Sequence, residues 1–123
     1  MKVLIVEDDP IVNRLFKTNL ENYNVNVTIA KNGVEAYKTL LNIKEEFDYI
    51  VIDITLPDEN GAEISKFIKS RFTSKIIIYT AHTYQDYKDM CKYDFFVEKG
   101  GVNSDGEYSL CLESVVDIIV NEF

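Results

Sequence analysis

Several side chains that could do chemistry stand directly after short apolar runs of the chain. They are Glu7, Asp8, Asp9, Asp53, Thr80 and Lys99. Carboxylates can bind a divalent cation or attack phosphorus, and a hydroxyl and an ammonium can face the oxygens of a transferring phosphoryl group. If the fold brings these residues together, the set predicts phosphoryl chemistry assisted by a metal ion.

The elements that must position these residues are short apolar runs that alternate five times with stretches of helical period. This alternation is typical of βα units on a parallel sheet. The expected strands are residues 3–6, 25–29, 49–52, 76–79 and 95–97. Helices are expected after Asp9, from Asn32 and Gly33, from about Asn60, over residues 83–93, and from a capping box of Ser104 and Glu107 through Tyr108, Cys111 and Ile119.

The second run, in which Val25, Val27 and Ile29 alternate with polar residues, constrains the order of the strands. Such alternation is typical of a strand with one well-buried face, so this strand is expected at an edge of the sheet. The first and third strands are then neighbours, as in a three-layer α/β fold with the flavodoxin-like (βα)5 topology and the order 2-1-3-4-5.

That order predicts that Glu7, Asp8 and Asp9 lie beside Asp53, where a parallel sheet binds its ligands. Four carboxylates in one small site repel one another unless a cation neutralises them. Oxygen ligands that are few in number and lie on a shallow rim suit Mg²⁺.

Length and composition restrict the other classes of function. The 123 residues predict a single domain over residues 1–123, and the net charge of -8 argues against nucleic acid or an anionic membrane as the partner. Cys91 and Cys111 lack metal-ligand spacing, and no apolar run approaches the length that spans a membrane. We therefore expect a cytoplasmic protein whose cysteines are reduced and lie in the core.

Together, four motifs resemble the receiver domain of two-component response regulators. They are Leu4-Ile5-Val6-Glu7-Asp8-Asp9-Pro10, Asp53 with Pro57 and Gly61, Thr80-Ala81, and Lys99. The resemblance implies that Asp53 is the phosphoacceptor and that Asp8 binds Mg²⁺ directly. It also implies that the backbone carbonyl of Thr55 is a ligand and that Glu7 lies nearby, where it could act through a water molecule.

The same resemblance implies switch roles nearer the end of the chain. Thr80 would move toward the phosphoryl group, Lys99 would pair with it, and Phe96 stands at the family's aromatic switch position. Phe96 could equally be a core residue, since an aromatic side chain in a short strand usually is. His82 stands where the family's side chain borders the site, so it either tunes the access of water or has no role.

The chain also departs from the family pattern. Gly100 stands where a proline usually follows the lysine, and Cys91-Lys92-Tyr93 replaces the usual turn of small residues. The fourth helix, fifth strand and last helix form the family's signalling face. Divergence there suggests an unusual partner, or a homodimer that forms through that face.

The leading hypothesis is a stand-alone receiver that takes a phosphoryl group from a sensor histidine kinase or a phosphotransfer protein. It would catalyse only its own phosphorylation and dephosphorylation, and would signal by contact with a protein target that the sequence does not identify. The alternative is a pseudo-receiver, a binding module that is never phosphorylated. An Asp-x-Asp-x-Thr phosphatase would need an aspartate in place of Thr55, and Glu7, Asp8 and Asp9 would repel the phosphate of FMN.

Overall fold

The chain folds around a parallel sheet of five strands. The computed structural model describes residues 1–100 and 111–121. Its elements, in chain order, are β1 (Lys2–Val6), α1 (Pro10–Glu21), β2 (Asn26–Ala30), α2 (Gly33–Asn42), β3 (Tyr49–Ile52), α3 (Gly61–Arg71), β4 (Lys75–Thr80), α4 (Tyr84–Tyr87), β5 (Phe95–Glu98) and α5 (Leu112–Asn121). The strand order is β2-β1-β3-β4-β5 and every neighbouring pair is parallel, which confirms the predicted three-layer α/β fold.

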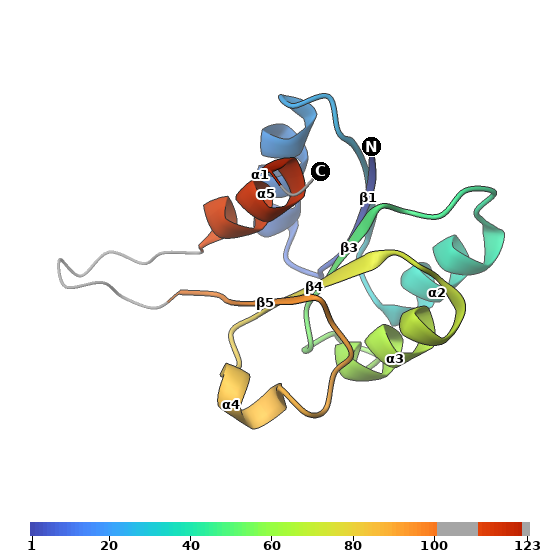
Figure 1. Cartoon of the computed structure of the whole chain (residues 1–123), viewed down its shortest axis with the longest axis vertical. Coiled ribbons are helices and arrows are strands. Elements are labelled where there is room, and N and C mark those ends of the chain that lie inside the picture. Colours follow the sequence, from blue (N-terminus) through green and yellow to red (C-terminus); the bar gives the residue numbers. More distant parts are fainter. Residues whose placement is uncertain (101–110, 122–123) are drawn as a thin grey trace, which may run out of the picture.

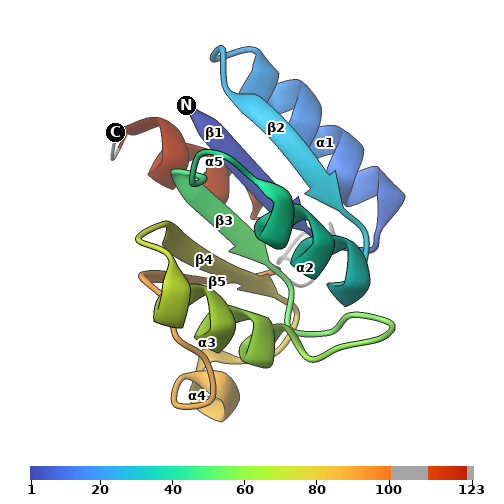
Figure 2. The ribbon, with the colours of Figure 1, turned by 90° about the vertical axis from the view of Figure 1, so that its right-hand side faces the viewer.

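Two helical layers cover the sheet. Helices α1 and α5 lie on one face, and α2 and α3 lie on the other (Figure 1, Figure 2). Successive residues of a strand point to opposite faces, so Val3 and Ile5 pack in the α1/α5 layer while Leu4 and Val6 pack in the α2/α3 layer. Strands β1, β3 and β4 are buried on both faces, which explains why they appear in the sequence as solid apolar runs.

Strand β2 lies at one edge of the sheet, as its alternating pattern predicted. The predicted helix starts are also confirmed at three places, because Asp9, Asn32 and Asn60 are the N-caps of α1, α2 and α3. Each side chain accepts a hydrogen bond from a backbone N–H that has no partner within its helix. In the described residues, none of the helices is both long and apolar enough to cross a bilayer.

A helix is confirmed within residues 83–93, but its predicted length was wrong, since α4 covers only Tyr84–Tyr87. The polar stretch has no continuous buried stripe: Tyr84 is 40% exposed and Met90 is 54% exposed. The chain leaves the helix so that Cys91 packs into the α2/α3 layer, and the N–H of Lys92 donates to Ser65 Oγ at 3.1 Å. The helical spacing of the apolar residues therefore overestimated the length of this helix.

The last helix begins at Leu112, so the prediction that it runs through Cys111 was also wrong. Cys111 has a φ of 51°, a left-handed conformation that interrupts a right-handed helix. The predicted capping box of Ser104 and Glu107, and Tyr108 after it, lie outside the described residues. Cys91 is buried, as predicted, whereas Cys111 is only partly buried.

Candidate functional site

The pairing of β1 with β3 brings the acidic segments together. Val6 pairs with Ile52, so Glu7 and Asp53 leave the sheet side by side. The N–H of Asp53 donates to the carbonyl of Val6 at 3.0 Å, and the N–H of Glu7 donates to the carbonyl of Ala30 at 3.0 Å. These backbone bonds place the start of both acidic segments at the carboxyl end of the sheet, where the strand order reverses.

Three carboxylates converge there. One oxygen from each of Glu7, Asp8 and Asp53 lies within 4.8 Å of the others. Glu7 is 2% exposed and Asp53 is 6% exposed, while Asp8 is open to solvent. The prediction of a fourth member was wrong for Asp9, because Asp9 is exposed and its Oδ1 caps α1 by accepting from the N–H of Ile11 at 2.9 Å.

Lys99 directly follows β5, the edge strand beside β4, and its side chain extends to the acidic group. Its Nζ donates to Glu7 Oε1 at 2.5 Å and to Asp53 Oδ2 at 2.9 Å, and only 12% of its side chain is exposed. Its backbone N–H donates to the carbonyl of Thr80 at 2.6 Å, which ties the residue to the end of β4. Burial opposes the charge on Lys99, but the bonds and charges of Glu7 and Asp53 outweigh it and hold the pKa of Lys99 above its ordinary value.

Glu7 is the carboxyl group that the site perturbs most clearly. Burial, followed by the charge of Asp53, raises the pKa of Glu7 to about 7, against the opposing effect of Lys99. Glu7 Oε2 accepts from the N–H of Asp8 at 2.8 Å, and the buried Asn13 donates from Nδ2 to the carbonyl of Glu7 at 2.7 Å. The contribution of Asn13 was not predicted, although an asparagine inside the apolar stripe of a helix was a usable signal.

The raised pKa of Glu7 predicts how the stability of the metal-free protein depends on pH. The folded state binds a proton on Glu7 that the unfolded state releases above pH 4.5, so the free energy of unfolding should fall between about pH 4.5 and pH 7. The fall should be on the order of 3 kcal/mol. Urea unfolding in EDTA at several pH values measures it.

Glu7→Gln is the matched variant for that measurement. Glutamine keeps an acceptor for the N–H of Asp8 but does not titrate, so the difference between the two proteins removes the contribution of the groups that lie away from Glu7. The difference in unfolding free energy should change with pH in this window. A difference that stays constant from pH 5 to pH 8 would contradict the perturbed carboxyl group.

The donor set fits a hard divalent cation. Three carboxylate oxygens lie close together and two of their residues are buried, so their charges repel in a poorly solvated place. Oxygen-only ligands beside an exposed rim are typical of Mg²⁺, which keeps several water molecules. Glu7, Asp8 and Asp53 are therefore residues that could hold the ion.

Thr55 belongs to the loop that follows Asp53 and folds back on it. The N–H of Thr55 donates to Asp53 Oδ1 at 3.2 Å, and Thr55 pairs with Asn60 in an isolated antiparallel bridge. The loop closes on Gly61, where an added Cβ would lie 2.0 Å from the carbonyl oxygen of Asp53. A side chain cannot fit there, so glycine is required for α3 to begin this close to the acidic group.

Thr80 and His82 lie at the end of β4. Thr80 is fully buried, and its Oγ1 accepts from the N–H of His82 at 3.3 Å. The His82 ring is 2.6 Å from Thr55 Oγ1 through Nε2 and packs on Tyr87, with ring centroids 4.6 Å apart. His82 therefore joins the loop after β3 to the loop after β4 at the rim of the site.

Phe96 belongs to an aromatic cluster beside α4. It is partly buried and makes edge-to-face contacts with Tyr84 at 5.2 Å and with Tyr93 at 5.6 Å between centroids. The contacts agree with both interpretations that the sequence left open. Its switch role stays a prediction.

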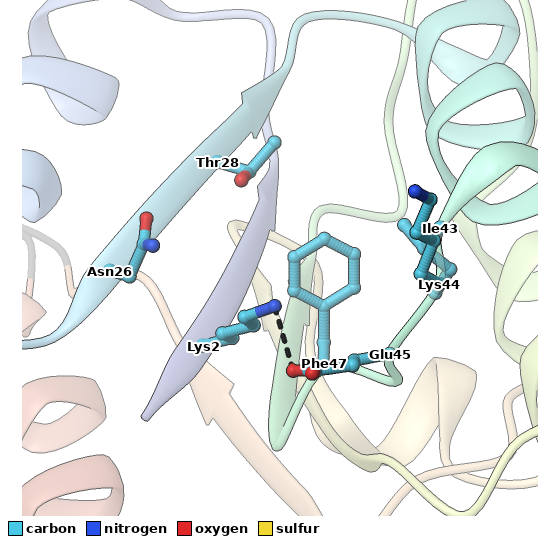
Figure 3. A pocket seen from close by; sticks show the side chains of 7 residues that line it. All are labelled: Lys2, Asn26, Thr28, Ile43, Lys44, Glu45 and Phe47. Carbon is cyan, nitrogen blue, oxygen red and sulfur yellow. Dashed lines mark ion pairs between the residues drawn. The ribbon is translucent and has the colours of Figure 1, made fainter.

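A separate hollow lies at the opposite end of the sheet. Its volume is about 330 Å³, and Lys2, Thr28 and Phe47 are among the residues that line it (Figure 3). Lys2 begins β1, whereas Glu7 follows the end of β1. The hollow is therefore separate from the acidic site, and Lys2 Nζ beside it is paired with Glu45 Oε2 at 2.9 Å.

Comparison with known sequences gives matches over most of the chain. The sequence model of the response regulator receiver domain matches residues 3–95. Response regulator ArlR of Staphylococcus saprophyticus is 38% identical over 80 residues, which are 65% of this chain and 36% of that protein. Transcriptional regulatory protein ResD of Bacillus subtilis is 31% identical over 80 residues, 65% of this chain and 32% of that protein. The chain thus spans about a third of the length of these curated relatives.

Solved structures show the same likeness. A receiver domain protein from Methanospirillum hungatei has a TM-score of 0.78 and 26% identity, over 98% of this chain and 91% of that one. TrrA from Thermotoga maritima, solved in complex with Mg²⁺-BeF, has a TM-score of 0.68 and 29% identity, over 80% of this chain and 86% of that one.

The family match ends before Lys99, so the position of that residue in the site depends on the geometry alone. The matched segment contains the acidic residues and Thr80, and the fold that carries them is the one found in the neighbouring structures. The chain therefore belongs to the response regulator receiver domain family.

Proposed function

We propose that the chain is a phosphorylation-dependent switch of a two-component pathway, with Asp53 as the phosphoacceptor. One observation carries the proposal: three carboxylates lie within 4.8 Å of one another, and Lys99 bridges Glu7 and Asp53. Asp8, Asp53 and the backbone carbonyl of Thr55 would hold Mg²⁺, with Glu7 nearby. The complex of TrrA with Mg²⁺-BeF supports this assignment by analogy.

The proposed donor is a phosphohistidine of a sensor histidine kinase or a phosphotransfer protein. An oxygen of Asp53 attacks the phosphorus, the P–N bond breaks, and the imidazole nitrogen leaves with the electron pair and takes up a proton. A bound Mg²⁺ would offset the charge of the carboxylates and of the phosphoryl oxygens. Lys99 starts 2.9 Å from Asp53 Oδ2, so its ammonium is placed to pair with the phosphoryl group.

Phosphorylation must then bias a conformation. Moving an equilibrium from about 1:99 to 99:1 needs about 5.5 kcal/mol, and a hydrogen bond to a charged group contributes about 1.5–3 kcal/mol. The hydroxyl of Thr80 is therefore insufficient alone, and Lys99 and the binding of a protein target should contribute. The face of α4, β5 and α5, which carries Phe96, is the proposed output face, through a protein target or a homodimer.

The alternative function is a pseudo-receiver that binds a partner without phosphorylation. Incubation with acetyl phosphate, with Mg²⁺ or with EDTA, separates the two on a gel that retards phosphoproteins. We expect a shifted band with Mg²⁺ only. The absence of a shifted band in both conditions would favour the binding module.

A further inference from the structure

The loop between β3 and α3 is attached to the start of α2, in a distant part of the chain. Asp58 Oδ1 accepts from the N–H of Gly33 at 2.7 Å, and Asp58 Oδ2 accepts from the N–H of Val34 at 3.0 Å. The first N–H groups of a helix have no partners within it. Asn32 satisfies one of them from α2's own segment, at 2.8 Å from the N–H of Glu35, and Asp58 satisfies two from outside.

The same contact needs a residue without a side chain. A Cβ added to Gly33 would lie 2.5 Å from Glu59 Cβ and 3.2 Å from Asp58 Oδ1. Glu59 Cβ is fixed to the backbone of the loop, so a larger residue at position 33 would push the loop away. The hydrogen bonds of Asp58 and the lack of a side chain at Gly33 therefore both allow the loop to lie against the start of α2.

This attachment closes a ring of contacts around the acidic group. The N–H of Glu7 bonds Ala30, the last residue of β2, and α2 follows directly. From α2 the ring passes through Asp58 into the loop, and the loop returns to Asp53, whose N–H bonds β1. The loop also carries Thr55, whose Oγ1 is hydrogen-bonded to Nε2 of His82.

We propose that Asp58, seated on Gly33, is a positioning residue that holds the β3–α3 loop in the conformation that binds Mg²⁺ and accepts the phosphoryl group. The inference depends on the proposed function for its metal and phosphoryl readouts. The charge of Asp58 suits the positive end of α2, and the bond from Gly33 lowers the pKa of Asp58 below its ordinary value. Asp58 therefore stays ionised at neutral pH and keeps both acceptors.

The test is a Mg²⁺ titration of the ¹⁵N-labelled protein, followed through the amide shifts, with hydrogen exchange of residues 54–60 in the metal-free protein. Residues that orient metal ligands typically affect affinity by about 10- to 100-fold, and we expect about tenfold weaker Mg²⁺ binding for Asp58→Ala. Amide exchange in the loop should become faster. Asp58→Asn keeps an acceptor for Gly33 and should recover most of the affinity.

Two further variants separate loop position from helix stability. Asn32→Ala removes the other cap of α2 and should leave Mg²⁺ affinity unchanged. Gly33→Ala places a better helix former in α2 but displaces the loop, so it should weaken Mg²⁺ binding while α2 stays folded.

The outcomes distinguish the inference from the proposed function. Wild-type affinity and loop exchange in both Asp58→Ala and Gly33→Ala would overturn the positioning role and leave the phosphorylation proposal intact. Equal losses in Asn32→Ala and Asp58→Ala would also overturn it, since both would then act through helix stability. If the wild type neither binds Mg²⁺ nor takes up a phosphoryl group, the proposed function fails, and unchanged loop exchange in Asp58→Ala still decides the structural role.

Discussion

An Asp53→Asn variant should take up no phosphoryl group from acetyl phosphate under conditions that phosphorylate the wild type. The variant loses the nucleophilic carboxylate, because an amide oxygen does not replace it as an attacking group. Asparagine has the same shape and can still accept from the N–H of Thr55 through Oδ1. The loss would therefore report the chemistry of Asp53 and not the fold. Intact-mass measurement and a phosphoprotein gel give the extent of modification.

The same variant should not be less stable without metal. Asp53 is one of three close carboxylates, and its charge contributes to the raised pKa of Glu7. Removing that charge relieves repulsion, so urea unfolding in EDTA at pH 8 should give at least the wild-type free energy. Asp9→Asn is the matched control, because Asp9 lies outside the group and asparagine caps a helix as well as aspartate does. A phosphorylated Asp53→Asn protein would refute the assignment of the acceptor.

Most of the fold was predictable because the burial of a strand determines which of its residues are apolar. Strands β1, β3 and β4 are covered on both faces and appear as solid apolar runs, whereas the alternation in β2 marks an edge. The length of α4 was not predictable in this way. Its spacing is helical, but whether a polar stretch stays helical depends on a packing partner, and the stretch after Tyr87 has its buried anchor at Cys91 instead.

The site was predictable to the extent that strand ends determine it. The rule for parallel sheets predicts that Glu7, Asp8 and Asp53 lie together. It also places Asp9 in the acidic group, although Asp9 was separately predicted to cap α1; its side chain serves only the cap, which depends on local backbone geometry. The cap that Asp58 provides to α2 was missed for a different reason: the bond joins residues 24 and 25 positions apart, and no local pattern encodes it.

A Lys99→Met variant should phosphorylate about 100- to 1,000-fold more slowly than the wild type, the loss typical of removing one donor that stabilises developing charge. The ammonium lies 2.5 Å from Glu7 and 2.9 Å from Asp53, and methionine fills similar space without a charge. Initial rates with acetyl phosphate at saturating Mg²⁺ measure the effect.

The variant should also destabilise the metal-free protein, because Glu7 and Asp53 would be left buried without their cation. Removing one partner of a buried pair typically costs about 3–5 kcal/mol. The loss should be largest above pH 7 and smaller at pH 5, where Glu7 is protonated and needs no counter-ion.

Lys69→Met provides the control for both measurements. Lys69 Nζ pairs with Asp94 Oδ2 at 2.6 Å, and Asp94 lies just before β5, at the amino ends of the strands. The chemical change is the same but the pair is remote from the acidic group, so the phosphorylation rate should stay at the wild-type value. If Lys99→Met kept the wild-type rate, the ammonium would have no part in phosphoryl transfer. If both variants slowed equally, the loss would arise from the fold and not from the charge that Lys99 brings to Asp53.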